Sequence, residues 1–256
     1  MLIMNNQHLA FRSSVFKTLK ISDRLIEFLS KRINLLIVDD LDMTLNCLEG
    51  FFSTPFIRVF TASNSEDAFK LISMPSLQWH CWIIDMNLGK RDNEGLDIIE
   101  RHEHFPFTVI FSGIGSMEIA AQATKLGVAE VVDKAHDPIN KLIIKACKIM
   151  SLGVLCKMIL QKNRSLFFLL KEKIIKDPHA WAYSANMSLR QLQNICYSYT
   201  RMPPSFALPM YYGLQYLLVS SFESLSPPPE YLENQIFFTN CIDFIDQNLT
   251  HYKNCL

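Results

Sequence analysis

Short apolar runs, each followed at once by polar side chains, recur through the first 150 residues of the chain. Runs of this length with polar ends are typical of strands buried on both faces of a parallel sheet. The polar residues that follow them are Asp39 and Asp40 after residues 35–38, Asp85 after 80–84, Ser112 after 108–111, and Asp133 and Lys134 after 129–132. Since the carboxyl ends of parallel strands meet at one edge of a sheet, we expect these side chains to share one pocket.

Helical periodicity fills the intervals between these runs, and a further strand is expected at residues 56–62. The expected helices span residues 41–52, 65–73, 95–101 and 117–125, with another from Pro138 onward. Parallel strands need crossover connections, and the crossover helices cover both faces of the sheet. Residues 33–150 therefore predict an α/β domain with a five-stranded, doubly wound parallel sheet of the flavodoxin-like order, in which the first and third strands are neighbours.

The rest of the chain shows helical patterns only. Residues 1–32 can place Leu25 and Leu29 on one side of a helix and Arg24 on the other, which predicts an accessory helix packed on the body. Residues 151–164 continue the helix that begins after Pro138 and predict a helical linker. From residue 165 to residue 256 glycine is nearly absent and prolines separate helical segments, which predicts a second, all-α domain.

Composition narrows the classes of function. The 25 basic and 25 acidic residues cancel, so the whole chain has no general attraction for nucleic acid or anionic membranes. Its seven cysteines lack the spacing of zinc ligands and are typical of reduced thiols. Lysines interrupt the apolar stretch 142–160, so no membrane span is expected, and the N-terminus shows no secretory signal. We expect a cytoplasmic protein.

Asp39, Asp40 and Asp85 would crowd together in the predicted sheet. Three carboxylates in a small cleft repel one another unless a hard cation neutralises them, and Mg²⁺ prefers such oxygen ligands. A carboxylate beside Mg²⁺ can accept a phosphoryl group when a lysine such as Lys134 and a hydroxyl such as Ser112 stabilise the transferred oxygens. The alternative is a metal-free domain in which Asp39 or Asp40 only caps the next helix.

In order and spacing, residues 33–150 resemble the receiver domain of two-component response regulators, and the residues that carry the resemblance are Asp39, Asp40, Asp85, Ser112, Gly113 and Lys134. The resemblance implies that a sensor histidine kinase phosphorylates Asp85. It implies that Asp40, Asp85 and the backbone carbonyl of Asn87 bind Mg²⁺, with Asp39 acting through a water. It further implies that Ser112 and Lys134 hold the phosphoryl group. No second catalytic constellation is present, so we do not expect an enzyme.

One departure from the family concerns how the signal would leave the site. Receivers often carry an aromatic residue three positions before the lysine, and its ring moves between solvent and core. That position is Val131 in this chain. A valine has no ring to move, so transmission by aromatic rotation is not expected.

Ser188 predicts the start of a short helix over residues 189–199. This helix would turn Leu192 and Ile195 inward. The side chains that it would present outward are Arg190, Gln191, Gln193 and Asn194. Arg, Gln and Asn make paired hydrogen bonds to guanine and adenine in the major groove of DNA. An ordinary surface helix with a polar outer face is the alternative.

The landmarks around this helix resemble the first helix-turn-helix and the connecting helix of AraC-type transcription regulators, and they are Trp181 and residues 187–192, 202–204 and 213–218. Residues 238–252 are weakly similar to that family's second recognition helix. Arg201 stands where the family has glycine. Asp243 and Asp246 stand where neutral or basic residues would face phosphates, and carboxylates there oppose binding to the DNA backbone.

Two functions follow from these patterns. In the first, phosphorylation of Asp85 controls transcription through an AraC-like DNA-binding domain. In the second, the helical domain no longer binds DNA and regulates by contact with another protein. A homodimer through the receiver or the linker helix is compatible with both. Basic residues gathered on one face would favour DNA and dispersed ones a protein partner, and these residues are 171, 173, 176, 190 and 201.

Overall fold

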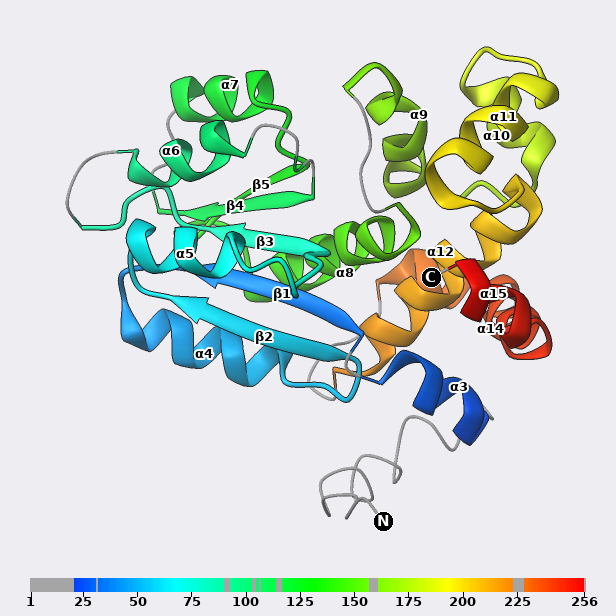
Figure 1. The fold of residues 1–256 in the computed structure, drawn as a ribbon, viewed down its shortest axis with the longest axis horizontal. Helices are drawn as coiled ribbons and strands as arrows, with labels where there is room; N and C mark the ends of the chain where they lie inside the picture. The colour runs from blue at the N-terminus through cyan, green and yellow to red at the C-terminus, as the bar shows by residue number, and fades with distance from the viewer. Residues whose placement is uncertain are drawn as a thin grey trace.

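The computed structural model describes residues 21–30, 32–89, 93–102, 105, 107–113, 117–156, 161–222 and 228–255. In chain order, its elements are α3 (Asp23–Leu29), β1 (Ile33–Val38), α4 (Asp42–Phe52), β2 (Ile57–Ala62), α5 (Ser65–Ile72), β3 (Cys81–Ile84), α6 (Glu94–Arg101), β4 (Thr108–Ser112), α7 (Met117–Lys125), β5 (Glu130–Asp133), α8 (Ile139–Leu155), α9 (Gln161–Glu172), α10 (Pro178–Ser184), α11 (Leu189–Thr200), α12 (Pro204–Ser220), α13 (Pro229–Glu233), α14 (Gln235–Gln247) and α15 (Leu249–Cys255). Figure 1 shows a layered sheet half beside a wholly helical half.

The strands form one parallel sheet in the order β2-β1-β3-β4-β5, which confirms the predicted fold class and strand order. β1 and β3 are neighbours, and Val38 pairs with Ile84 at their carboxyl ends. The next residue of each segment is an aspartate, so Asp39 and Asp85 leave the sheet side by side.

Helices cover both faces of the sheet (Figure 1). Leu35 and Ile37 of β1 point into the core shared with α4 and α8. Leu36 and Val38 point into the opposite core, which contains residues of α5, α6 and α7. Because both faces are covered, the strands are apolar along their whole length, and this produces the unbroken apolar runs of the sequence.

Helix α8 connects the two halves of the molecule. Every residue from Ile149 to Leu155 is buried. The helix packs on the sheet and on α12, and one hydrophobic core runs from the sheet through α8 into the helical half. Each buried leucine or isoleucine contributes about 1.5–3 kcal/mol to folding, so the contact between α8 and α12 ties the halves together firmly.

The predicted linker begins inside this helix. Residues 151–155 form the last part of α8, and residues 157–160 lie outside the described part of the chain. The domain border at residue 150 therefore remains a prediction, and the described residues on either side of it share a core.

At Gly153, α8 packs closely against the backbone of His80, the residue directly before β3. A Cβ added there would lie 2.0 Å from the carbonyl oxygen of His80, whereas one added at Gly50 of α4 would meet nothing within 4 Å. We expect Gly153→Ala to lower the free energy of unfolding by about 1–3 kcal/mol because the packed backbone must shift. Gly50→Ala should raise it by about 0.5–1 kcal/mol because alanine is the better helix former. Urea unfolding of both variants checks this, and equal effects would contradict the packing.

The described part of the N-terminal extension packs against the helical half. Leu25 and Leu29 of α3 are buried, and α3 contacts α14 and α15. The Ser22 hydroxyl donates a hydrogen bond to Asp246 of α14 at 2.5 Å. The accessory helix expected from the sequence is thus present over Asp23–Leu29, and residues 1–20 lie outside the described part.

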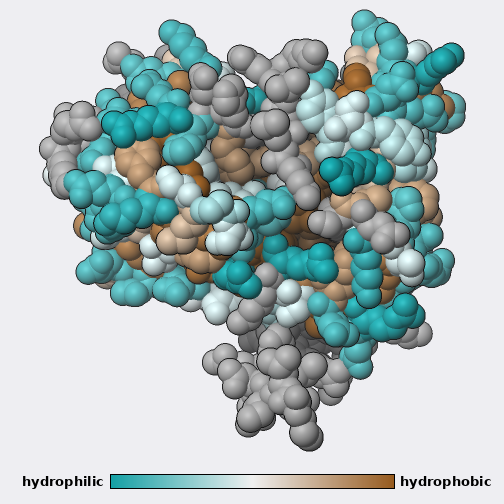
Figure 2. Space-filling view, viewed as in Figure 1, coloured by the Kyte–Doolittle hydropathy of each residue, from teal (hydrophilic) through white to brown (hydrophobic). Residues whose placement is uncertain are grey.

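None of the helices in the described ranges is long and apolar enough to span a membrane. In the face shown in Figure 2, hydrophilic residues are spread over both halves, and hydrophobic ones reach the surface in separate patches.

Candidate functional site

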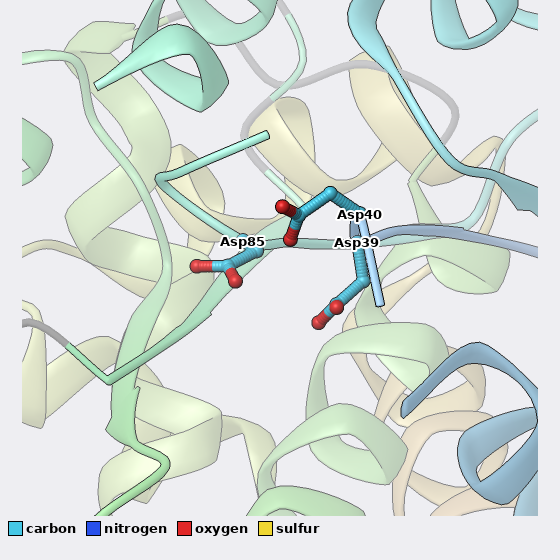
Figure 3. Close-up of side chains that lie close together, drawn as sticks. All are labelled: Asp39, Asp40 and Asp85. Carbon is cyan, nitrogen blue, oxygen red and sulfur yellow. The ribbon is translucent and has the colours of Figure 1, made fainter. Parts of the chain in front are cut away.

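Three aspartates meet at the carboxyl edge of the sheet (Figure 3). Asp39 and Asp40 follow β1, and Asp85 follows β3. Each offers a carboxylate oxygen, and these oxygens all lie within 4.8 Å of one another. Asp39 and Asp85 are buried and Asp40 is exposed. The site is therefore an acidic cluster that is open to solvent on the side of Asp40.

Lys134 supplies the positive charge of this cluster. It directly follows β5, and its Nζ forms ion pairs with Asp39 and Asp85, each at 2.5 Å. The Phe111 ring also lies beneath this ammonium group, with its centroid 5.3 Å from Nζ. The convergence of these residues from three strand ends, expected from the sequence, is present.

The helix-capping alternative does not account for the aspartates. The residue at the N-cap of α4 is Leu41, which makes no side-chain capping hydrogen bond. Asp39 accepts a hydrogen bond from the Leu41 amide at 3.0 Å with one oxygen, and its other oxygen binds Lys134. Neither Asp39 nor Asp40 is the capping residue, so their shared position calls for another explanation.

Burial acts against the charge on Asp39. Loss of solvent raises the pKa of this carboxyl above its ordinary value, although hydrogen bonding to Lys134 opposes the shift. Burial therefore destabilises the charged form of Asp39 relative to the neutral form. A further cation beside it would stabilise the charged form.

Ser112 and Asn87 lie at the same edge of the sheet. Ser112 is buried at the end of β4, and its carbonyl accepts a hydrogen bond from the Lys134 amide at 2.9 Å. The Asn87 amide donates to Asp85 at 3.4 Å, and the Asn87 side-chain oxygen accepts from the amide of Asn93 at 3.2 Å. Asn87 thus helps to shape the loop after β3, while a metal-binding role for its carbonyl remains a prediction.

Two glycines that were not selected from the sequence also shape the site. A Cβ at Gly95 would lie 2.1 Å from the carbonyl oxygen of Asp85. Gly89 has φ +83°, and a Cβ there would lie 3.1 Å from a carboxylate oxygen of Asp40. The sequence signal was a pair of glycines in the polar stretch after a buried strand, which marks tight turns and close backbone approach.

The polar helix predicted in the second half is α11. Ser188 caps it, with its hydroxyl accepting from the Gln191 amide, while the Gln191 side chain accepts from the Ser188 amide at 2.8 Å. Arg190, Gln193 and Asn194 are exposed on this helix, as expected. Gln191 is exposed too, but its side-chain oxygen accepts the hydrogen bond of the capping box. The other three side chains predicted to contact DNA take no part in the cap.

The basic residues of the helical half do not all remain available at its surface. The Lys171 side chain is only 8% exposed and is paired with Glu130 of the sheet half at 2.6 Å. Lys173, Lys176, Arg190 and Arg201 are exposed. Asp243 is exposed on α14, whereas Asp246 accepts a hydrogen bond from Ser22.

In its sheet order and in the cluster of Asp39, Asp40, Asp85 and Lys134, the first half is similar to the receiver domains found in response regulators. Curated relatives include proteins described as NtrX-like response regulators. One from Rickettsia conorii is 28% identical over 127 residues, and one from Rickettsia bellii is 29% identical over 126 residues. The match covers 47% of this chain and 26% of each relative, so the chain spans about a quarter of their length. No family model matches the chain.

Solved structures give matches of similar extent. A response regulator receiver protein from Pseudoalteromonas atlantica is 16% identical with a TM-score of 0.42, covering 47% of this chain and 98% of that one. The receiver domain of the Francisella response regulator 1452 is 20% identical with a TM-score of 0.41, covering 48% of this chain and 99% of that one.

Proposed function

We propose that this chain is a phosphorylation-controlled response regulator whose acceptor is Asp85 and whose donor is a sensor histidine kinase. The observation that carries the proposal is the pairing of Asp85 and Asp39 with Lys134 at the carboxyl edge of the sheet. The resemblance to NtrX-like regulators over about half of the chain supports it. The function of the full protein goes beyond this matched half and is part of the proposal.

The chemistry follows from the positions of these groups. An oxygen of Asp85 attacks the phosphorus of a phosphohistidine, the new P–O bond forms as the P–N bond breaks, and the imidazole leaves with the electron pair. Lys134 neutralises charge on the transferred oxygens, and the Ser112 hydroxyl donates a hydrogen bond to one of them. Asp39 and Asp40 add negative charge beside the incoming phosphoryl group. The transfer therefore calls for a cation at the cluster that neutralises these carboxylates.

The donor set fits Mg²⁺, because three carboxylate oxygens within 4.8 Å of one another match its preference for oxygen ligands. Asp40 and Asp85 would hold the ion with the carbonyl of Asn87, and Asp39 would act through a water. When bound, the ion supplies positive charge to the phosphoryl oxygens.

Mg²⁺ should raise the thermal unfolding midpoint of the protein, since an ion at 100 times its dissociation constant adds about 2.7 kcal/mol to stability. Asp40→Asn should remove most of this increase because it deletes an exposed ligand while leaving the fold intact. Asp243→Asn, a change at an exposed carboxylate on α14, should leave the increase unchanged. Differential scanning calorimetry with and without Mg²⁺ measures it, and equal increases in the two variants would contradict the ligand assignment.

For the output, we propose transcriptional control through α11, with Arg190, Gln193 and Asn194 reading base edges. Their exposure on one capped helix next to the turn after α10 supports this role. The test is a selection from random duplex DNA with phosphorylated protein at moderate salt. Enrichment of a common sequence is expected, and a pool that stays random would exclude this output.

A helical half that binds another protein is the second candidate. Two observations favour it: Lys171 is held by Glu130 and is withdrawn from the basic set, and Asp243 is exposed on α14. Both reduce the attraction of this half for a phosphate backbone. The same DNA selection separates the two candidates.

A further inference from the structure

A cavity of about 220 Å³ lies at the amino edge of the sheet, at the opposite ends of β1 and β3 from the acidic cluster. The amino ends of these strands point toward the helical half (Figure 1). The cavity has walls from five segments, and these include Leu29 of α3, Asn34 of β1, His80 before β3, Val154 of α8 and Leu214 of α12. The N-terminal extension, the sheet half and the helical half therefore all contribute to one cavity.

One side of the cavity is apolar and rigid. Leu29, Val154 and Leu214 are buried in the core that joins the two halves. Gly153, next to Val154, packs so closely on the carbonyl of His80 that the position of α8 at this wall is fixed. This side suits the hydrocarbon part of a ligand, because burial of apolar area is favourable.

The polar side is held in place by its own hydrogen bonds. The backbone amide of Asn34 donates to Nδ1 of His80 at 3.0 Å, and the His80 amide donates to the Asn34 carbonyl at 3.0 Å. The Asn34 side chain donates to the carbonyl of Gln78 at 2.7 Å. A ring nitrogen that accepts a hydrogen bond carries no proton, so His80 is neutral in this arrangement and adds no charge. The polar wall is thus preformed.

The polar wall contains an unpaired acceptor. Asn34 is 8% exposed, and its Oδ1 accepts no hydrogen bond from any residue that the structure describes. Which atom is the oxygen is clear, because the other amide atom donates to Gln78. A buried acceptor without a donor is unfavourable, so this wall favours a ligand that brings a hydrogen-bond donor. Gln78 lines the same wall and its side chain is exposed, so the wall can be reached from solvent.

Arg32, which directly precedes β1, makes the cavity positive. It is exposed, and its guanidinium lies 4.6 Å from the centroid of the Phe28 ring. It forms no ion pair with an acid of the described ranges, and none of the described residues that line the cavity is acidic. A guanidinium binds a carboxylate through two parallel hydrogen bonds. A single arginine matches the one charge of a carboxylate better than the charge of about −2 on a phosphate group.

Size and charge define the ligand further. At about 30 Å³ for each water molecule, the cavity has room for about seven waters, which is the size of a small organic acid. An amino group would enter as an ammonium ion, and no described acid of the lining would neutralise it, so a neutral hydroxyl is the better donor. Arg32 and Asn34 are two positions apart in the chain, and the carboxylate and hydroxyl that they bind must therefore be close together in the ligand.

We propose that this cavity binds a small 2-hydroxy acid with an apolar side chain. The carboxylate of the ligand pairs with Arg32, and its hydroxyl donates to Oδ1 of Asn34. Its side chain packs against Val154 and Leu214. Because the walls come from α3 and from both halves, the bound acid stabilises their arrangement. The proposal does not depend on Asp85, so it can fail or hold separately from the proposed phosphorylation.

Titration calorimetry of the full chain with 2-hydroxyisocaproate tests the ligand class, and saturable binding is expected. Three relatives of this probe each change one group: isocaproate lacks the hydroxyl, the corresponding diol lacks the carboxylate, and leucine has an ammonium group in place of the hydroxyl. Each should bind at least about tenfold more weakly, since it leaves Asn34 or Arg32 without a partner or adds an unpaired charge. Equal binding of any relative overturns the proposal, as does the absence of saturable 2-hydroxyisocaproate binding at millimolar concentrations.

Two variants test the position of the site. Arg32→Gln should weaken binding of 2-hydroxyisocaproate at least about tenfold, because it removes the charge that pairs with the carboxylate. The matched control is Arg24→Gln, since Arg24 is an exposed arginine of α3 that does not line the cavity. It should bind like wild type. An Arg32→Gln protein with native circular dichroism that binds as tightly as Arg24→Gln overturns the proposal.

Hydrogen exchange on the wild-type chain locates the bound acid independently. Saturating 2-hydroxyisocaproate should slow amide exchange in α3, because Leu29 of this helix forms part of the cavity wall and the ligand stabilises the closed state. Binding that leaves exchange in α3 unchanged would place the acid elsewhere on the molecule and would also overturn the proposal.

Discussion

Asp85→Asn is expected to abolish phosphorylation of the protein by acetyl phosphate. The amide keeps the shape of the side chain but removes the attacking oxygen, and loss of a nucleophile lowers such reactions by more than about a thousandfold. The fold should remain, since asparagine can still accept a hydrogen bond from Lys134 in place of the ion pair. The measurement is phosphate incorporation followed by intact mass.

Asp243→Asn on α14 is the control, because Asp243 is an exposed aspartate far along the chain from the site. It should be labelled like wild type. Labelling that persists in a folded Asp85→Asn protein would contradict the acceptor assignment.

Replacing Arg190 and Asn194 together with alanine is expected to abolish selective binding of duplex DNA. These exposed residues lie one helical turn apart on α11. Each paired contact to a base contributes about 1–3 kcal/mol of discrimination, so losing two lowers the affinity for the selected sequence at least about thirtyfold. Binding to unrelated DNA should fall much less, since it depends mainly on phosphate contacts. Fluorescence anisotropy with the selected duplex and a scrambled one measures both.

Gln122→Ala on α7 of the sheet half changes a similar exposed side chain and should bind both duplexes like wild type. Gln191 is left intact in the double variant because its side chain completes the cap of α11. Equal affinity of wild type and double variant for the selected duplex would remove α11 from the DNA contact and favour a protein partner.

The fold and the acidic cluster were predictable because each strand of the sheet half carries its own signal. β1, β3 and β4 are apolar runs that end in Asp39, Asp85 and near Ser112, and the rule for parallel crossovers places those ends at one edge. The cap of α11 was predictable too, since Ser188 and Gln191 have the spacing of a capping box. The same spacing places the Gln191 side chain in the cap, and its predicted contact to DNA stays a prediction.

The contacts between the halves were not predictable in this way. Glu130 binds Lys145 and Lys171, which lie 15 and 41 residues further along the chain, and Ser22 binds Asp246 at a separation of 224 residues. Pairings at these separations depend on how helices pack, and local periodicity carries no information about them. The burial of α8 on two sides did leave a signal, the nearly continuous apolar run after Pro138, but a linker and a core helix give the same run.

Locating the phosphoryl group in the wild-type protein tests whether Asp85 is the acceptor. The protein is treated with acetyl phosphate and Mg²⁺, reduced with borohydride so that an acyl phosphate becomes an alcohol, digested, and sequenced by mass spectrometry. We expect reduction at Asp85, dependent on Mg²⁺. Reduction at Asp39 or Asp40 in its place, or none at all in a protein with native circular dichroism, would contradict it.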